Sequence, residues 1–420
     1  MESALEAYRG CADSLQRLQN VLDNEDAVNS VLEEATNHLK AMRNSCAHGT
    51  AVQDGIAQLP DLTRIFDFIL FEDDIKRFSY LPSFPPLQRM CWQTMANLCV
   101  QNVTTQSMIW SHFGHKVIEA TRHSSSYTNI QIMILFNIFQ SGNIQSYDKT
   151  IFEVLITKLS ENPNDTCEFS EIFLEYFLTS YHRVVFLYGT LADQDRIMVL
   201  YYIAEYVRNS TPERRVNHSL LTYISKELKK KSDCILRTHN ASDVEHLRPR
   251  EVLALLDVIA LASGMEIYSE IYCNDHSLFL NVGGLLQQLK AIGESSQNIF
   301  TPMKKLEQVA PNSKISSDFE TEISFRLKTT LVRILANLSY KNRKNQEYAR
   351  ETGIIMAILD CTSADGRNPL IKEWSILAIR NLCEKCPENQ ELIANLSKVG
   401  DAENELLKEL NLELGSLRIQ

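Results

Sequence analysis

Glycine and proline are scarce in this sequence, at 14 and 11 of 420 residues. All-β folds normally need more of both for their many tight turns, so the composition favours long helices. Hydrophobic residues make up 44% of the chain and charged residues 23%. These fractions are ordinary for a protein that buries a large core.

Long hydrophobic runs are also lacking. The longest, residues 252–262, is interrupted by Asp257 and falls short of the roughly 20 residues that a membrane-spanning helix needs. The first residues carry no basic-then-apolar leader, so we expect a cytosolic protein without a membrane span. The ten cysteines are scattered through apolar helical patterns, which indicates reduced thiols in a core.

Basic charge is in deficit, with 42 basic against 53 acidic residues and a net charge of −11. This balance does not favour nucleic acid or an anionic membrane as the main partner. The sequence lacks glycine-rich phosphate loops and nucleophile motifs. Cys383 and Cys386 form a lone C-x-x-C without the second ligand pair that structural zinc needs. We therefore expect no enzymatic activity, no cofactor and no metal.

The chain repeats itself near its C-terminal end. Asn337 is followed eight residues later by Asn345, and Asn381 by Asn389, at an offset of 44 residues. The first asparagine of each set ends an apolar helical run, and the second is predicted to N-cap the next helix. Repeats of this length are typical of HEAT and armadillo proteins. The pattern predicts an all-α, right-handed, armadillo/HEAT-like solenoid in which each unit covers the apolar face of the next.

Weaker copies of the repeat occur near the other end. Asn44 and Asn97 are each followed nine residues later by glutamine, Gln53 and Gln106, as Asn381 is followed by glutamine 390. Between residues 147 and 292 the repeat fades while apolar residues keep helical spacing. A Gly283-Gly284 pair in that stretch indicates a helix end.

The domain prediction follows from these patterns. Residues 1–292 are predicted to be divergent armadillo-like repeats. Residues 293–318, with clustered glycine, serine and asparagine and two prolines, are predicted to be a linker loop. Residues 319–420 form the predicted C-terminal armadillo domain. Leucines alternate with polar residues on either side of Gly415-Ser416, which indicates a short β-hairpin at residues 410–419.

The recurring asparagines are the candidate partner-binding residues. Asn44, Asn97, Asn337 and Asn381 share one repeat frame, so stacked repeats would bring them along one face as a ladder. Side-chain amides on such a face could clamp the backbone of an extended peptide, as armadillo proteins do. Alternatively, each amide bonds a neighbouring backbone group at a helix end. Both interpretations remain open at this stage.

Peptide-binding armadillo repeats usually place tryptophan four residues before each ladder asparagine. Here those positions hold Lys40, Gln93, Arg333 and Leu377. Trp374 lies seven residues before Asn381, on nearly the same helical face, and joins the candidate ladder. The missing tryptophans count against peptide clamping of the usual kind.

Two long stretches resemble the C-terminal domain of the ataxin-10 family. They are LVRILANLSYKNRKNQ at 331–346 and NPLIKEWSILAIRNL at 368–382, the latter followed by ENQELIA at 388–394. Weaker echoes stand at 43–46 and 96–99. The resemblance implies an armadillo-like scaffold without enzymatic activity that self-associates and acts in cytokinesis, neuronal survival and neurite outgrowth.

The same resemblance implies partners and places. The partners are a heterotrimeric G-protein β subunit, O-GlcNAc transferase and further copies of the chain as a homo-oligomer. The places are the cytoplasm, its perinuclear region and the midbody. We therefore predict a non-enzymatic protein-binding scaffold that self-associates through residues 325–396. The alternatives are an importin- or catenin-like armadillo receptor for an extended peptide or cargo, and a helical enzyme.

Overall fold

The computed structural model describes residues 2–18, 20–123, 126–142, 144–161, 168–237, 247–303, 323–363 and 365–399. These ranges contain helices and turns and no strand, so the all-α prediction is confirmed. The hairpin predicted at residues 410–419 lies outside the described residues, as does the 304–318 part of the predicted linker.

The chain divides into two compact units, residues 1–177 and 178–420, and α10 crosses the division. Unit 1 contains the helices α1 Glu2–Leu18, α2 Glu25–Ser45, η1 Cys46–His48, α3 Thr50–Ala57, α4 Leu62–Leu70, α5 Asp73–Lys76, α6 Phe84–Leu98, α7 Val103–His123, α8 Thr128–Gln140, η2 Gln145–Tyr147, α9 Asp148–Glu161 and α10 Glu168–Thr179. The domain boundaries predicted at 292 and 318 stay predictions.

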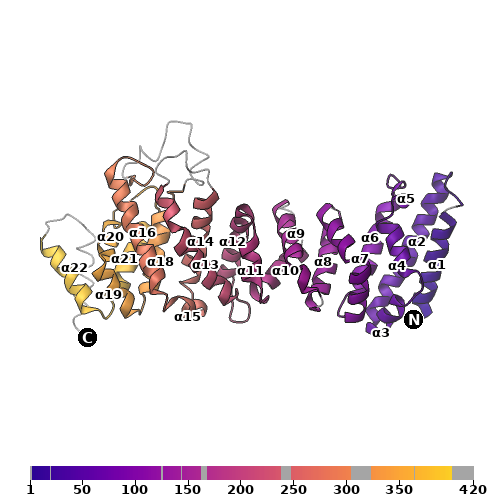
Figure 1. Ribbon diagram of the computed structural model, residues 1–420, viewed down its shortest axis with the longest axis horizontal. Helices are drawn as coiled ribbons and strands as arrows, with labels where there is room; N and C mark the ends of the chain where they lie inside the picture. The colour runs from indigo at the N-terminus through magenta and orange to yellow at the C-terminus, as the bar shows by residue number, and fades with distance from the viewer. Residues whose placement is uncertain are drawn as a thin grey trace. The chain divides into compact units, whose positions relative to one another are not determined.

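Unit 2 contains the remaining described helices (Figure 1). They are α11 Val184–Thr190, α12 Asp193–Arg208, α13 His218–Lys231, η3 Ser232–Arg237, α14 Leu247–Ala262, η5 Glu266–Tyr268, α15 Ser269–Tyr272, α16 His276–Ser295, α18 Leu327–Ser339, α19 Arg343–Glu351, α20 Ile354–Asp360, α21 Ile371–Cys383 and α22 Pro387–Val399. Among the described residues, no single helix has the length and apolar content of a membrane span. One pair, Arg248–Ala262 with Glu266–Tyr272, meets both criteria together across a 111° bend.

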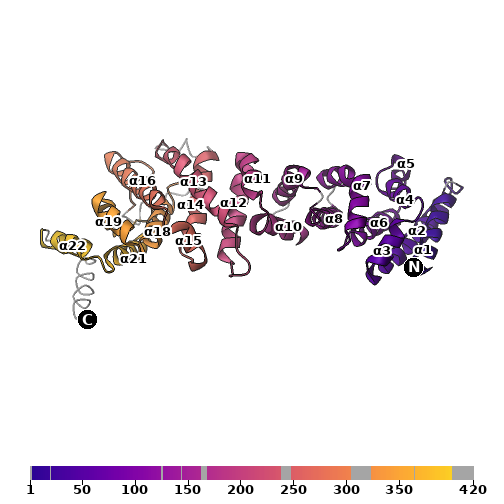
Figure 2. The same cartoon turned by 60° about the horizontal axis from the view of Figure 1, so that its bottom comes forward.

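Within each unit a set of helices stacks in a row. In unit 1, α2 packs against α6 and α6 against α8. In unit 2 the row runs α12, α14, α18, α21, each packed against the next (Figures 1 and 2). Helices that lie between row members in the sequence pack onto the row and onto one another. For example, α16 contacts the row helix α18 and also α20. This nearest-neighbour stacking is the arrangement expected of helical repeats.

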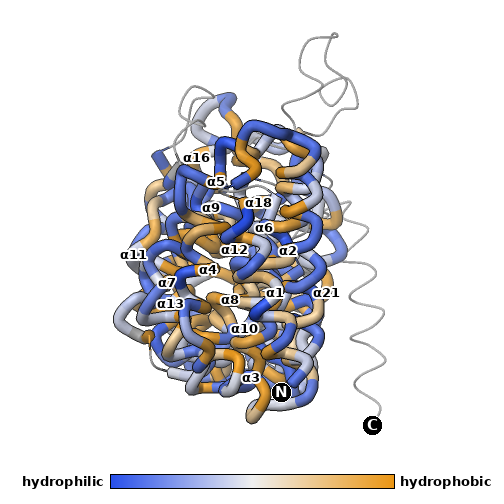
Figure 3. The backbone as a smooth tube through the Cα atoms, turned by 90° about the vertical axis from the view of Figure 1, so that its right-hand side faces the viewer, coloured by the Kyte–Doolittle hydropathy of each residue, from blue (hydrophilic) through white to orange (hydrophobic). Residues whose placement is uncertain are grey.

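The stacking follows from the apolar periodicity of each helix. In α4, the buried residues Leu62, Ile65, Phe66 and Ile69 recur at spacings of three and four, which places them on one face. Most helical segments therefore show both apolar and polar stretches along the backbone (Figure 3). A single helix of this kind cannot bury its apolar face alone, so the neighbouring repeat completes the core.

Aromatic side chains fill the core of unit 1 where α8 meets α10. The Phe139 ring centroid lies 5.4 Å from that of Phe173 and 5.1 Å from that of Phe177. Phe152 of α9 adds an edge contact to Phe177 at 4.9 Å. Tilted and edge-to-face pairs at these distances add stabilisation beyond the buried area.

Gly283 and Gly284 do not end a helix, so that prediction is wrong. α16 runs unbroken from His276 to Ser295. Gly283 is needed because α20 packs directly on it: a Cβ there would lie 2.2 Å from the Ile354 Cδ1. The glycine therefore allows α16 and α20 to approach closely. Local sequence signals do not reveal such a contact between distant segments.

We expect Gly283→Ala to destabilise unit 2 by roughly 1–3 kcal/mol, because the new methyl group overpacks the contact with Ile354. The matched control is Gly284→Ala, since a Cβ at that position meets nothing within 4 Å. That variant should be about 0.5–1 kcal/mol more stable than the parent, because alanine favours the helix. Urea unfolding measures both. Equal effects at the two glycines would contradict the packing argument, and adding Ile354→Val to Gly283→Ala should recover part of the loss.

Candidate partner-binding site

The four ladder asparagines lie on row helices that pack side by side. Asn44 lies in α2 and Asn97 in α6 of unit 1, whereas Asn337 lies in α18 and Asn381 in α21 of unit 2. α2 packs against α6, and α18 packs against α21. The structure therefore brings the asparagines together as two pairs, one in each unit.

The second asparagine of each pair donates a hydrogen bond back to the first helix. The Asn97 Nδ2 donates to the Arg43 carbonyl at 3.4 Å, and the Asn381 Nδ2 donates to the Ala336 carbonyl at 2.9 Å. In both pairs the acceptor is the residue directly before the earlier asparagine. The same contact therefore joins neighbouring repeats at opposite ends of the sequence.

Asn337 makes the equivalent contact with α14. Its Nδ2 donates to the Ala260 carbonyl at 3.2 Å and to the Ser263 hydroxyl at 3.1 Å. At Asn44 the side-chain oxygen instead accepts from the Arg43 guanidinium, at 2.8 Å from Nη2. Three of the four amides thus bond a backbone carbonyl of the preceding row helix. A role of the ladder in partner binding stays a prediction.

A left-handed turn follows three of the asparagines at one fixed spacing. Gln101, Lys341 and Lys385 each lie four residues after a ladder asparagine and have φ angles of 53°, 51° and 54°. A residue in this conformation stops a helix and redirects the chain. Lys341 and Lys385 are separated by the 44-residue repeat offset, so both repeats place a lysine at this turn.

A buried glutamine clamps the end of the following row helix in both units. In unit 1, the Gln53 Nε2 donates to the carbonyls of Asn97 and Val100 at 2.9 and 3.2 Å. In unit 2, the Gln346 Nε2 donates to the carbonyl of Asn381 and to that of the residue three positions later, at 2.9 and 3.1 Å. Carbonyls at a helix C-terminus have no partner within the helix, so these bonds satisfy them.

Asn345 and Asn389 are not N-caps, so that prediction is wrong. α19 begins after Asn342, whose side chain accepts from the Asn345 backbone N–H at 3.2 Å. The Asn345 Nδ2 donates to the Leu338 carbonyl at 2.8 Å, and Asn389 donates to Leu382 at the same distance. Both helices start earlier than the spacing indicated. The two asparagines tie each helix back to the one before it.

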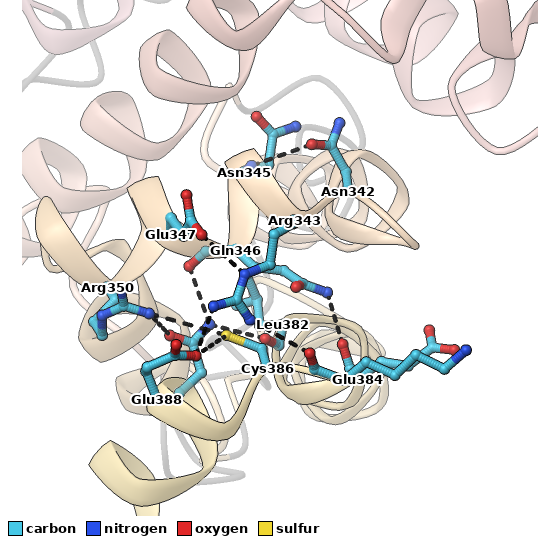
Figure 4. Close-up of polar contacts among 12 residues, drawn as sticks. Asn342, Arg343, Asn345, Gln346, Glu347, Arg350, Leu382, Glu384, Cys386 and Glu388 are labelled. Atoms are coloured by element: carbon cyan, nitrogen blue, oxygen red, sulfur yellow. Dashed lines mark hydrogen bonds and ion pairs between the residues drawn. The ribbon is translucent and has the colours of Figure 1, made fainter.

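Charged contacts reinforce the junction between α19 and α22 (Figure 4). The Arg350 Nη1 donates to the Asn389 Oδ1 at 2.9 Å. Arg343 pairs with Glu347 at 2.9 Å and with Glu388 at 2.7 Å. These exposed ion pairs add little individually. The buried amide bonds beneath them carry most of the specificity of the junction.

A groove lies over the row helices of unit 2. It consists of two adjoining hollows of about 620 and 470 Å³. Their shared lining comes from α12, α14 and the start of α18, namely Tyr201, Ala254, Asp257, Arg326 and Thr330. Trp374 lines the larger hollow, and the Arg333 guanidinium lies 5.1 Å from its ring centroid. In this groove the candidate residue Trp374 therefore contacts Arg333, which lies four residues before Asn337.

The groove concentrates charges that the surrounding protein does not neutralise well. Burial raises the pKa of the Asp257 carboxyl, although Arg326, Arg333 and Arg208 favour its charged form. Burial also lowers the pKa of the Arg333 guanidinium, against the attraction of Asp257. Opposite charges therefore face one another here without a direct ion pair between described residues.

Cys383 and Cys386 of the C-x-x-C pair are both buried. Burial raises the pKa of the Cys383 thiol to about 12, so it stays protonated at neutral pH. In the described part of the chain no group of three or more His, Cys, Asp or Glu side chains is placed to hold a metal ion.

Comparison with known families accounts for the C-terminal repeats. A family profile described as the Spinocerebellar ataxia type 10 protein domain matches residues 327–417. Ataxin-10 of Bos taurus and ataxin-10 of Homo sapiens are each 25% identical over 400 residues, which cover 92% of this chain and 80% of theirs. These matches support the ataxin-10 family for this chain.

A further relative is more similar over a shorter stretch. An ataxin-10 homolog of Dictyostelium discoideum is 57% identical over 88 residues, which are 21% of this chain and 14% of that protein. The family profile begins at Leu327, the first residue of α18. Among solved structures, an engineered protein aligns with 94% of the chain at 10% identity and a TM-score of 0.32, which is too weak to bear on the fold.

The glutamine clamps yield a stability prediction. Gln346→Ala should lower the free energy of unfolding of unit 2 by about 1–3 kcal/mol, because two helix-terminal carbonyls lose their donor in a buried site. Gln53→Ala should have a similar effect on unit 1. The control is the exposed Gln140 of α8, whose replacement by alanine should change stability by less than about 0.5 kcal/mol.

Urea unfolding followed by amide hydrogen exchange would measure the effect and locate it. Faster exchange should appear at the end of α21 for Gln346→Ala and at the end of α6 for Gln53→Ala. A midpoint as high as that of the Gln140→Ala control would show that the clamp contributes nothing.

Proposed function

We propose that this protein is a non-enzymatic protein-binding scaffold that self-associates through its C-terminal repeats, residues 325–396. The supporting observation is the use made of the repeated polar side chains. Asn97, Asn337, Asn381, Gln53 and Gln346 all bond backbone carbonyls of neighbouring helices. Such bonds hold helices in fixed positions, which suits a scaffold. Because these side-chain amides already bond backbone carbonyls, few of them are available for catalysis.

The surface that supports self-association lies on α22, the last described helix. Leu392 and Leu396 are only partly buried and lie four residues apart, so they share one face. Ile393, by contrast, is 1% exposed and packs inward. Helical repeats at the end of an array need a polar outer face to stay monomeric. Partly exposed leucines on this helix therefore favour docking of a second copy.

The resemblance to the ataxin-10 family extends the proposal. It adds a G-protein β subunit and O-GlcNAc transferase as partners, and the cytoplasm, perinuclear region and midbody as places of action. It also adds roles in cytokinesis, neuronal survival and neurite outgrowth. Affinity capture with the intact chain as bait, analysed for these two partners, tests this part of the proposal separately.

Self-association can be tested on the full chain. The parent should form an oligomer in light scattering at ~50 µM, a concentration that detects micromolar interfaces. Leu392→Glu combined with Leu396→Glu should shift it to the monomer, because two carboxylates would be buried in the interface. The matched control is Asn395→Glu, an exposed site on the same helix, which should leave the oligomer intact.

Circular dichroism on all three proteins confirms that the helices are retained. If the parent is monomeric at this concentration, self-association is ruled out. If the parent is oligomeric and the double variant remains so, the interface lies elsewhere than on α22.

A further inference from the structure

The groove of unit 2 contains arginines without acidic partners. Arg250 begins the groove on α14, Arg326 precedes α18, and Arg333 lies within α18. Within the described ranges none of the three forms an ion pair. Arg208, at the rim, is satisfied by Glu205. Asp257 is the one groove carboxylate without an ion-pair partner among described residues, so unpaired arginines exceed unpaired carboxylates three to one there.

Several other basic residues of unit 2 are paired. Lys229 lies 2.8 Å from Asp275, and Lys231 lies 2.8 Å from Glu251. Lys230 lies 2.8 Å from Glu227 on the same helix. In a chain with a net charge of −11, acidic partners are plentiful. Three arginines without an ion pair among described residues therefore gather in one groove.

Arg333 is the least satisfied of these groups. It is partly buried, and its Nε is buried without a hydrogen-bond acceptor. Its guanidinium lies over the ring of Trp374, at 5.1 Å from the centroid, which fixes the plane of the fork. A buried donor without an acceptor is costly. A carboxylate in the groove would accept from the partly exposed guanidinium, whose planar fork suits bidentate binding.

Apolar side chains line the same groove. Tyr201 is 60% exposed and Leu370 is 63% exposed, unusually high values for large hydrophobic residues. Together with Trp374 they provide surfaces for an apolar side chain of a ligand. The groove crosses four successive helices, so its length suits an extended chain, in which neighbouring side chains point alternately to opposite sides.

We propose that this groove binds an extended acidic segment of a partner protein. Its carboxylates meet Arg250, Arg326 and Arg333, and an apolar side chain of the segment packs on Trp374. Arginine clusters recognise acidic motifs in this way. The inference rests on the proposed function as a protein-binding scaffold and names the chemistry of one partner. The exposed Leu370 favours a peptide over nucleic acid, because an aliphatic surface pairs with an apolar side chain and not with a phosphate backbone.

Fluorescence anisotropy on the full chain tests the proposal. The probe is a fluorescein-labelled ten-residue peptide of alternating glutamate and leucine, and the matched probe replaces glutamate with lysine. The glutamate peptide should bind, and binding should weaken as salt rises from ~0.05 to ~0.5 M. The double variant Arg250→Glu, Arg326→Glu should weaken it at least about tenfold. Both arginines are exposed, so the variant should fold.

Arg380→Glu is the matched control. Arg380 is an exposed, unpaired arginine of α21 that does not line either hollow, so its reversal should change affinity less than about twofold. The chain has three tryptophans, and Trp92 and Trp110 belong to unit 1. Binding should therefore change the fluorescence of Trp374 alone, and Trp374→Phe should abolish that change.

Several results would overturn the proposal. These are no binding of the glutamate peptide, equal binding of the lysine peptide, equal loss with Arg380→Glu, and tighter binding of a labelled single-stranded oligonucleotide. Light scattering of the Arg250→Glu, Arg326→Glu variant separates this inference from self-association. An oligomer that persists leaves self-association intact whatever the peptide does. An oligomer that dissociates would identify a second copy, not a separate partner, as the occupant.

Discussion

Side-chain amides that bond backbone carbonyls of the adjacent helix are the contact on which this structure depends. Apolar packing alone would let neighbouring helices slide or rotate, because hydrophobic burial has no direction. An amide donor with a single buried acceptor does have direction. Asn97 bonding Arg43, and Asn381 bonding Ala336, fix the offset between successive row helices to one residue. Gln53 of α3 and Gln346 of α19 add bonds to the carbonyls of Asn97 and Asn381, which hold α3 and α19 in register with the row helices.

This constraint explains why the repeat is visible where it is. Amide bonds need particular residues at particular spacings, so they leave a sequence record, whereas apolar contacts accept leucine, isoleucine or valine equally. In the stretch from 147 to 292 the asparagine frame is absent, yet α12 still packs against α14. There the helices are joined by apolar and charged contacts, such as Arg196 with Glu251 at 2.8 Å.

Much of the fold could therefore be predicted from the sequence, and the site could be predicted only in part. The helical spacing of apolar residues predicts where helices form, because it is a local signal. The repeat offset predicts which helices are neighbours, because it is strictly periodic. The contact of Gly283 with Ile354 depends on how two distant helices approach, which no local signal records. The helix starts near Asn345 and Asn389 were misplaced because asparagine suits both a cap and a buried tie. Capping chemistry alone does not separate these two roles.

A ladder asparagine and a groove residue lie on the same face of α18, since Arg333 and Asn337 are four residues apart. The Asn337 Nδ2 donates to the Ala260 carbonyl and the Ser263 hydroxyl, so it has limited capacity to hold a peptide backbone. One turn earlier on α18, Arg333 projects into the groove with an unsatisfied donor. A tryptophan at that position would offer an aromatic surface and one N–H donor but no charge. An arginine there adds a preference for negative charge, while Trp374 on the next helix supplies the aromatic surface. In the proposed function, selectivity is therefore assigned to the residues beside the ladder, because Asn97, Asn337 and Asn381 bond backbone carbonyls of neighbouring helices.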